Sequence, residues 1–133
     1  MKPVFLDTAG LVAIWNEDDQ WHVSASAVFA DLVRARTKLI TTDFVLLECG
    51  NAASRRPFRS NVISLRNGLK AGRLLIAATI EDQQRAWEAF ERGEAGGAGI
   101  VDLVSFQVMR RLGLTRAFTG DAHFRAAGFE TMF

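Results

Sequence analysis

The chain has 133 residues, of which 49% are hydrophobic, and this composition suits one compact domain with a buried core. Its formal net charge of +1 favours no class of partner. The single cysteine, Cys49, excludes a disulfide framework, and a chain whose only histidines are His22 and His123 is a poor candidate for a zinc cluster. No apolar run reaches the roughly 18–20 residues of a membrane span, and the N-terminus lacks a signal-peptide pattern. We therefore expect a soluble cytoplasmic protein without a membrane partner.

The first part of the chain predicts a strand, two helices and a second strand. Residues 2–6 form an apolar run that ends at Asp7, which indicates a buried strand with this carboxylate at its tip. Residues 11–15 suggest a short helix, and residues 21–36 carry apolar side chains at helical spacing. Residues 38–41 predict the second strand.

A third helix is expected over residues 43–53, preceded by threonines that can cap it. Helical spacing places Glu48 on one face with Phe44, Leu47 and Asn51. Two interpretations of this glutamate stay open. It either forms an ion pair or points over the edge of the sheet.

Residues 54–73 are the most unbalanced part of the chain in charge, because no acid occurs between Cys49 and Ile80. A helix is expected over residues 58–70. Its basic side chains either form a solvated face or a rim that attracts polyanions such as RNA. These basic residues are Arg55, Arg56, Arg59, Arg66, Lys70 and Arg73.

Residues 74–78 predict a third strand, and residues 81–92 a helix. The inward side chains of this helix are expected to be Ala86, Trp87, Ala89 and Phe90. The glycine-rich stretch 93–99 is not a phosphate-binding P-loop, because no Gly-Lys-Ser/Thr follows it. It is expected to be a flexible loop.

The stretch 99–124 holds two further acids at element ends. Asp102 lies where a helix begins, and Gly113 is a natural stop for that helix. Residues 117–119 predict a short buried strand, with Asp121 just after it. A last strand is expected within residues 129–132.

Strands that alternate with helices predict a parallel sheet with helices on both faces, and such sheets bind ligands at the carboxyl ends of their strands. If the strands 2–6 and 117–119 are central neighbours, four acids meet in one cleft. Gathered carboxylates repel one another, and oxygen ligands select Mg²⁺ or Mn²⁺. Such an ion serves the hydrolysis of phosphodiesters. The four acids are Asp7, Glu48, Asp102 and Asp121.

Four motifs give the chain a family resemblance over its full length. They are LDT at 6–8, LE at 47–48, VDLVSF at 101–106 and TGDAHF at 119–124. With them the chain resembles the PIN-domain nucleases, in particular the VapC-like toxins of prokaryotic toxin–antitoxin pairs. The resemblance implies an α/β fold in a single domain over 1–133. That fold has three layers, α/β/α, around a central, mostly parallel sheet of about five short strands.

The resemblance also implies an activity, that of a Mg²⁺- or Mn²⁺-dependent endoribonuclease in which a metal-activated water attacks the RNA. Asp7, Asp102 and Asp121 would hold the metal, and Glu48 would act through a water. Hydroxyl groups would orient the carboxylates or waters. The residues that carry these hydroxyls are Thr8, Ser105 and Thr119.

The implied partners are an RNA substrate, a cognate antitoxin and a second copy of the chain in a homodimer. The implied contact residues for RNA or antitoxin are Arg55, Arg56, Arg59 and Arg66. The chain departs from the family pattern at Gly120, where many members have a bulky residue, and at Ala122, where an arginine is frequent.

Two other functions are weighed against a nuclease. The first is a binding module for RNA or protein that keeps the fold and cleaves nothing. The second is a receiver-like phosphoacceptor domain, which also gathers aspartates at strand ends. The receiver fits less well, because the paired acids near the first strand and the lysine after a late strand are missing.

Overall fold

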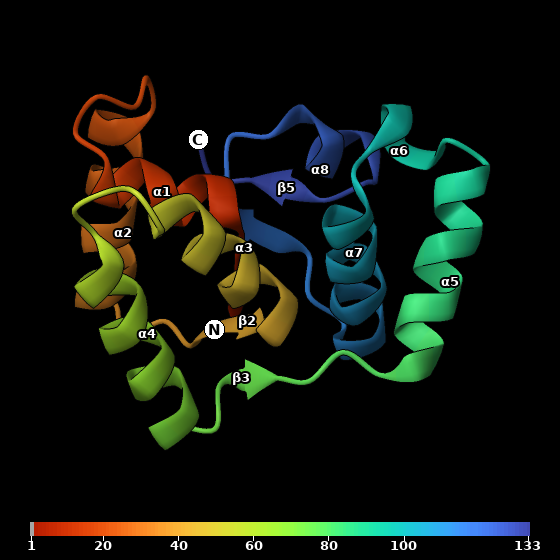
Figure 1. Ribbon diagram of the computed structural model, residues 1–133, viewed down its shortest axis with the longest axis horizontal. Helices are drawn as coiled ribbons and strands as arrows, with labels where there is room; N and C mark the ends of the chain where they lie inside the picture. The colour runs from red at the N-terminus through yellow and green to blue at the C-terminus, as the bar shows by residue number, and fades with distance from the viewer. Residues whose placement is uncertain (1) are drawn as a thin grey trace.

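In the computed structural model, which describes residues 2–133, five short parallel strands form one sheet in the order β3-β2-β1-β4-β5 (Figure 1). The prediction of about five short, mostly parallel strands is confirmed. The condition for the four acids to meet holds, because the first strand and the strand near residue 117 lie side by side at the centre. The strands are β1 (Val4–Leu6), β2 (Leu39–Thr42), β3 (Leu75–Ile76), β4 (Arg116–Phe118) and β5 (Glu130–Thr131).

The sheet reverses its direction of growth between β1 and β4. From β1 the chain moves outward through β2 to β3, and then crosses back to add β4 and β5 on the other side of β1. The register pairs Leu6 with Phe118, so the residues that follow both strands leave the sheet at the same edge. Ligands of open parallel sheets bind at such a reversal.

The helices cover both sides of this sheet. In Figure 1, α2 and α4 lie to the left, α3 overlaps β2 near the centre, and α5 and α7 lie together to the right. Within residues 2–133, every helix is too short or too polar to cross a lipid bilayer. The helices are α1 (Thr8–Trp15), α2 (His22–Arg34), α3 (Asp43–Ala53), α4 (Arg59–Ala71), α5 (Ile80–Glu91), α6 (Glu94–Gly97), α7 (Ile100–Leu112) and α8 (Ala122–Ala126).

Aromatic side chains join the sheet to α7 and α8. Phe5, Phe118, Phe106 and Phe124 are all fully buried. The rings of Phe106 and Phe124 meet edge to face with their centroids 4.9 Å apart. Aromatic pairs prefer this geometry, and burial of such large side chains contributes most of a core's stability. The rings therefore anchor α8, which follows Asp121, against α7, which carries Asp102.

The predicted inner face of α5 is partly wrong. Ala86 and Ala89 are fully buried, but Trp87 is 55% exposed and Phe90 is 48% exposed. The two aromatic rings contact each other edge to face, with centroids 5.7 Å apart. The helix packs against α7, and small buried side chains such as these alanines allow two helices to approach closely. The large rings fall on the other side of the helix.

The expected face of α3 also needs correction. Leu47 is 67% exposed and Asn51 is exposed, whereas Val45 and Cys49 are buried. Glu48 is half-buried and lies at the boundary between these two faces. Helical periodicity locates the edge of a buried face only to within about one residue. In α3 the buried positions lie one residue further along the chain than the predicted face.

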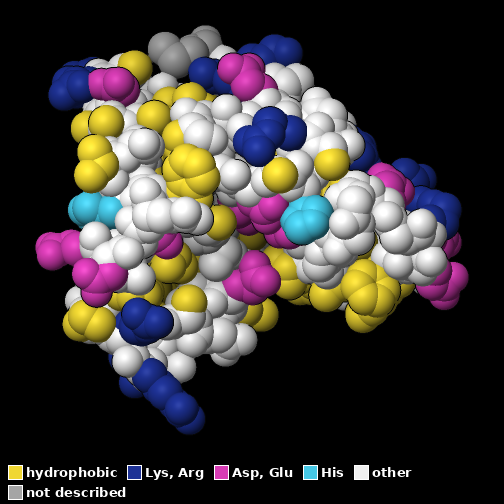
Figure 2. All heavy atoms as spheres, turned by 90° about the horizontal axis from the view of Figure 1, so that it is seen from above, with side chains coloured by type: hydrophobic (Ala, Val, Ile, Leu, Met, Phe, Trp, Pro, Cys, Tyr) yellow, Lys and Arg dark blue, Asp and Glu magenta, His cyan; other side chains and the backbone are white. Residues whose placement is uncertain are grey.

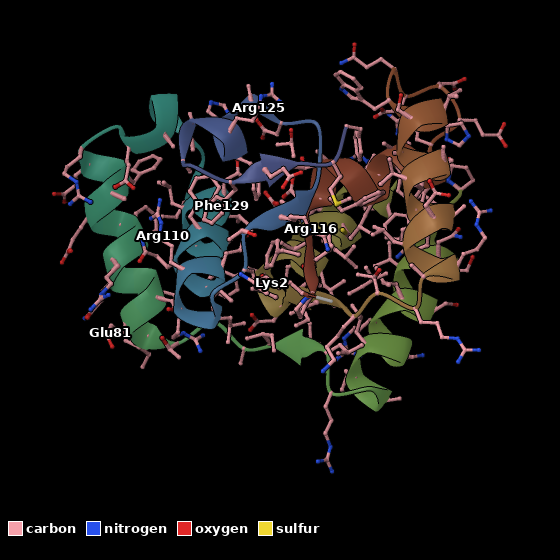
Figure 3. The ribbon with its side chains drawn as sticks, turned by 180° about the vertical axis from the view of Figure 1, so that it is seen from behind. Lys2, Glu81, Arg110, Arg116, Arg125 and Phe129 are labelled. Atoms are coloured by element: carbon pink, nitrogen blue, oxygen red, sulfur yellow. The ribbon has the colours of Figure 1, made fainter. Side chains whose placement is uncertain are left out.

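The glycine-rich stretch forms a tight turn in place of the expected flexible loop. Ala95 has φ 57° and ψ 41°, and Gly96 has φ 72° and ψ 26°, so both lie in the left-handed region. Glu94 accepts hydrogen bonds from Arg92 and Arg110. Figure 3 shows Arg110 beside Phe129, and its guanidinium carbon lies 5.6 Å from that ring's centroid. These contacts tie the turn to α7 and to the segment before β5.

Candidate active site

The four predicted acids line one cleft at the reversal point of the sheet. The cleft has a volume of about 330 Å³, and its other lining residues are Thr8, Ala9 and Val12. In Figure 2, acidic side chains gather beside a histidine near the middle of the face seen from above. The expectation that these acids converge is met in the geometry. They are Asp7, Glu48, Asp102 and Asp121.

Asp7 forms the floor of the cleft, where β1 ends and α1 begins. Its side chain is 2% exposed, and its Oδ2 accepts a hydrogen bond of 2.8 Å from the hydroxyl of Thr119. Burial raises the pKa of Asp7 to about 7, and the charges of Asp102, Asp121 and Glu48 raise it as well. The Thr119 hydrogen bond acts in the opposite direction but is outweighed. Asp7 is thus a carboxyl group whose negative charge lacks compensation.

The hydroxyl of Thr119 connects the residues that follow the two central strands. Besides its bond to Asp7, its Oγ1 accepts a hydrogen bond of 3.1 Å from the backbone N–H of Asp121. One hydroxyl therefore joins the ends of β1 and β4. This contact exists because the parallel pairing of Leu6 with Phe118 brings the two following residues together.

Glu48 reaches the cleft from α3. Its Oε1 accepts a hydrogen bond of 2.7 Å from the hydroxyl of Thr8 at the start of α1. Among residues 2–133, no lysine, arginine or histidine forms a salt bridge with Glu48. Of the two interpretations drawn from the sequence, the geometry therefore matches a glutamate that points over the edge of the sheet.

Asp102 and Asp121 lie at the mouth of the cleft. Asp102 belongs to the first turn of α7, and burial raises its pKa to about 7. The charges of Asp121 and Glu48 raise it further, and His123 lowers it. Asp121 precedes α8, where its Oδ1 accepts a hydrogen bond of 2.9 Å from the backbone N–H of His123.

Ser105 differs from the other two predicted hydroxyl residues. Thr8 and Thr119 each donate to a carboxylate of the cleft, at 2.7 and 2.8 Å. Ser105 is fully buried, and its Oγ has no hydrogen-bond partner among the residues that the structure describes. It lies one helical turn after Asp102 in α7. A buried hydroxyl without a partner in the protein is a place for an ordered water or a ligand group.

The donor set fits a hard divalent cation. Of the described residues that line the cleft, none is a lysine or an arginine. The pKa values of Asp7 and Asp102 are both raised to about 7, so the site holds more negative charge than the protein itself neutralises. Carboxylate oxygens together with waters are the ligands that Mg²⁺ and Mn²⁺ take in proteins.

His123 is a site residue that the sequence analysis did not select. Its Nδ1 lies 3.0 Å from Oδ1 of Asp121. Asp102, Asp121 and His123 each offer one ligand atom, and these atoms lie within 4.8 Å of one another. Asp7 and Glu48 line the same cleft but are outside this tight group. The sequence feature that could have identified His123 is its position two residues after Asp121, an acid that follows a strand.

The basic residues of the segment 55–73 lie apart from the lining of the cleft. Arg56 borders a separate pocket with Trp15 and Phe58, between the end of α1 and the segment that precedes α4. Arg66 borders another, with Asp43 and Leu75. All four predicted contact residues are exposed: Arg55, Arg56, Arg59 and Arg66.

Cys49 behaves as a small buried hydrophobic residue. It is fully buried, and burial raises the pKa of its thiol to about 12. A thiol with so high a pKa is a poor nucleophile.

Gly120 has a steric explanation. A Cβ at this position would lie 3.3 Å from the ring of Phe133 and 3.3 Å from the ring of Trp21. These two rings contact each other with their centroids 6.1 Å apart. The aromatic pair thus takes up the space that a bulky side chain would need.

Comparisons with known proteins show the family to which this chain belongs. The family model for the PIN domain matches residues 4–130. The 23S rRNA-specific endonuclease VapC20 of Mycobacterium tuberculosis is 30% identical over 127 residues, which cover 95% of both chains. The crystal structure of VapC20, described as a sarcin–ricin loop cleaving toxin, has a TM-score of 0.77 at 27% identity over 95% of each chain. VapBC2 from Rickettsia felis, with a TM-score of 0.63 at 18% identity over 96% of each chain, supports the fold alone. The chain therefore belongs to the PIN-domain family, among its VapC-like members.

Proposed function

We propose that this protein is a divalent-metal-dependent endoribonuclease, the toxin of a toxin–antitoxin pair. The observation that carries the proposal is the convergence of four acids on one cleft whose described lining residues include no lysine or arginine. The proposal is supported by the likeness to VapC20, which is described as an RNA endonuclease. It accounts for the raised pKa values of Asp7 and Asp102, since a cation would supply the missing positive charge.

We assign metal binding to Asp7, Asp102 and Asp121, and a role through water to Glu48. Bound Mg²⁺ or Mn²⁺ would supply a nucleophilic water and neutralise charge on a phosphate oxygen. The chain's own contribution is to hold the carboxylates in place. Thr119 orients Asp7, Thr8 orients Glu48, and the unpartnered Ser105 hydroxyl is assigned to an ordered water.

The proposed substrate is a structured RNA. VapC20 is described as specific for 23S rRNA and as cleaving the sarcin–ricin loop, so a hairpin of that loop is the first RNA to test. RNA in a loop exposes unstacked bases and a bent backbone, which proteins read by shape. We assign RNA contact, or contact with an acidic antitoxin segment, to the exposed residues Arg55, Arg56, Arg59 and Arg66. A homodimer in the cytoplasm, bound by its antitoxin until release, completes the proposal.

The test is cleavage of the hairpin by purified protein with Mn²⁺, with Mg²⁺ or with EDTA. Asp102→Asn removes one carboxylate of the cleft, and Asp18→Asn is a matched control at an exposed acid outside it. We expect metal-dependent cleavage that Asp102→Asn lowers at least about 100-fold and that Asp18→Asn leaves unchanged.

Two results would overturn the proposal. Cleavage that persists in Asp102→Asn would assign the activity to a contaminating nuclease. If well-folded protein binds the hairpin with the same affinity in EDTA and cleaves neither it nor total ribosomal RNA, the chain is the catalytically silent binding module.

A further inference from the structure

His123 is held at the mouth of the cleft by two neighbouring segments. Its backbone N–H and its ring Nδ1 lie 2.9 and 3.0 Å from the same oxygen, Oδ1 of Asp121. On the other side, ring atom Cδ2 lies 3.8 Å from the place where a Cβ on Gly96 would be. The left-handed turn that contains Gly96 thus lies beside the ring. The imidazole remains open to solvent, with 41% of the side chain exposed.

The spacing of His123 relative to the two acids is close to that of ligands around one ion. Ligands about 2.1 Å from an octahedral ion are about 3 Å apart when adjacent and about 4 Å apart when opposite. The His123 Nδ1 to Asp121 Oδ1 distance is 3.0 Å, and the ligand atoms of Asp102, Asp121 and His123 all lie within 4.8 Å of one another. A cation at the mouth of the cleft would therefore be within reach of a ring nitrogen as well as two carboxylates.

We propose that His123 supplies a nitrogen ligand to the cation of this site and thereby makes the site prefer Mn²⁺ to Mg²⁺. The inference rests on the proposed function, because it takes the acid cleft to be a metal site. Its chemical basis is the difference between the two ions. Mg²⁺ takes oxygen ligands and keeps much of its water, whereas Mn²⁺, although it also takes carboxylates, is a transition-metal ion that accepts an imidazole nitrogen more readily than Mg²⁺ does.

The competing role for His123 is to orient Asp121 without touching the ion. An imidazole that only holds a carboxylate in place affects every ion that binds that carboxylate. Loss of such a residue would weaken Mn²⁺ and Mg²⁺ to a similar degree. The ratio of the two affinities therefore separates a ligand from a positioning residue.

The first experiment measures Mn²⁺ binding by electron paramagnetic resonance, and Mg²⁺ binding by competition, at one fixed pH. The proteins are the full chain, His123→Gln, Asp102→Asn and the matched control His22→Gln. His22 is a suitable control because its Nδ1 bonds the carbonyl of Ala13, and it does not line the cleft. We expect His123→Gln to weaken Mn²⁺ about 10-fold or more and Mg²⁺ less than about 3-fold, with His22→Gln unchanged.

The second experiment needs no variant, so it does not depend on whether His123→Gln folds. Pulsed electron paramagnetic resonance of the Mn²⁺-loaded chain detects nitrogen bound directly to the ion. We expect a nitrogen-14 coupling that changes to a nitrogen-15 coupling when the protein is labelled with nitrogen-15 histidine. Asp102→Asn should abolish the bound Mn²⁺ signal.

The outcomes distinguish this inference from the proposed function. Bound Mn²⁺ without a histidine nitrogen coupling, or equal losses of both ions in His123→Gln, would overturn the role of His123 and leave the nuclease proposal standing. A folded full chain that binds neither ion would overturn both.

Discussion

Replacement of Asp7 by asparagine should make the metal-free protein less sensitive to pH. Asp7 is buried at the floor of the cleft, and burial raises its pKa from 3.8 to about 7. A carboxyl group whose pKa is raised in the folded state favours folding at low pH. That contribution is lost as the pH rises from about 4 to about 7, because the unfolded chain ionises and the folded chain resists ionisation. Asparagine has the same shape, cannot ionise, and can still accept the hydrogen bond from Thr119.

The magnitude follows from the size of the shift. About two pH units separate pH 5 from the folded pKa of about 7, and each unit corresponds to 1.36 kcal/mol. Asp7 should therefore destabilise the folded state by about 3 kcal/mol more at pH 8 than at pH 5. The difference in unfolding free energy between Asp7→Asn and the unsubstituted protein should rise by about that amount from pH 5 to pH 8. Terms that do not depend on pH, such as the burial of an amide, cancel in this comparison.

The assay is urea unfolding of both proteins in EDTA at the two pH values, with Asp18→Asn as the control at an exposed acid. With saturating Mn²⁺ the unsubstituted protein should become more stable than Asp7→Asn, because the ion stabilises only the protein that binds it. A pH-independent difference between Asp7→Asn and the unsubstituted protein would refute the reasoning. It would mean that Asp7 is ionised in the fold without penalty.

Three further predictions concern the cation, the packing of α1 and the turn before α7. Between about pH 6 and pH 8, Mn²⁺ affinity should rise up to about 10-fold for each proton that the ion displaces, because the pKa values of Asp7 and Asp102 are about 7. Calorimetry in buffers of different ionisation enthalpy should detect this proton release. No release near pH 6 would contradict the raised pKa values. Gly10→Ala should destabilise the fold by more than about 3 kcal/mol, because its Cβ would collide with the carbonyl oxygen of Phe118 and lie 2.6 Å from that ring's Cδ2. Gly50→Ala has open space and should stabilise α3 by up to about 1 kcal/mol, so equal effects of the two substitutions in thermal unfolding would contradict the packing. Arg110→Ala should lower the free energy of unfolding by about 1–2 kcal/mol and speed amide exchange over residues 93–97. The reason is that Arg110 donates hydrogen bonds to Glu94 and to the carbonyl of Ala127 and lies over the ring of Phe129. Unchanged exchange would show that the turn does not depend on these contacts.

Much of the site was predictable because its acids occupy the ends of elements. Asp7 follows an apolar run, Asp102 opens a helix and Asp121 follows a short strand, and local patterns locate such ends well. The alternation of strands and helices then requires parallel pairing, which brings the carboxyl ends of strands to one edge. For Glu48 the sequence left two interpretations open, because its environment depends on which stripe of α3 is buried.

Side-chain orientation on the outer helices was harder to predict. Trp87 and Phe90 are apolar and occur at helical spacing, yet they are about half exposed, while Ala86 and Ala89 are fully buried in this helix, which packs against α7. A large apolar residue is buried only if the facing surface leaves room for it. Which side chains of an outer helix are buried thus depends both on its own small residues and on the shape of the neighbouring helix.

The sequence by itself determined the order and type of nearly all elements, the four acids and the family, because these depend on patterns within a few residues or on motifs read along the chain. Only the tertiary structure decided that β1 pairs with β4, which lets Thr119 bond Asp7 across 112 positions of the chain. It also decided that His123 turns toward Asp121 and that the turn with Gly96 lies beside its ring. Contacts of this kind depend on how distant segments approach one another, and no local periodicity carries that information.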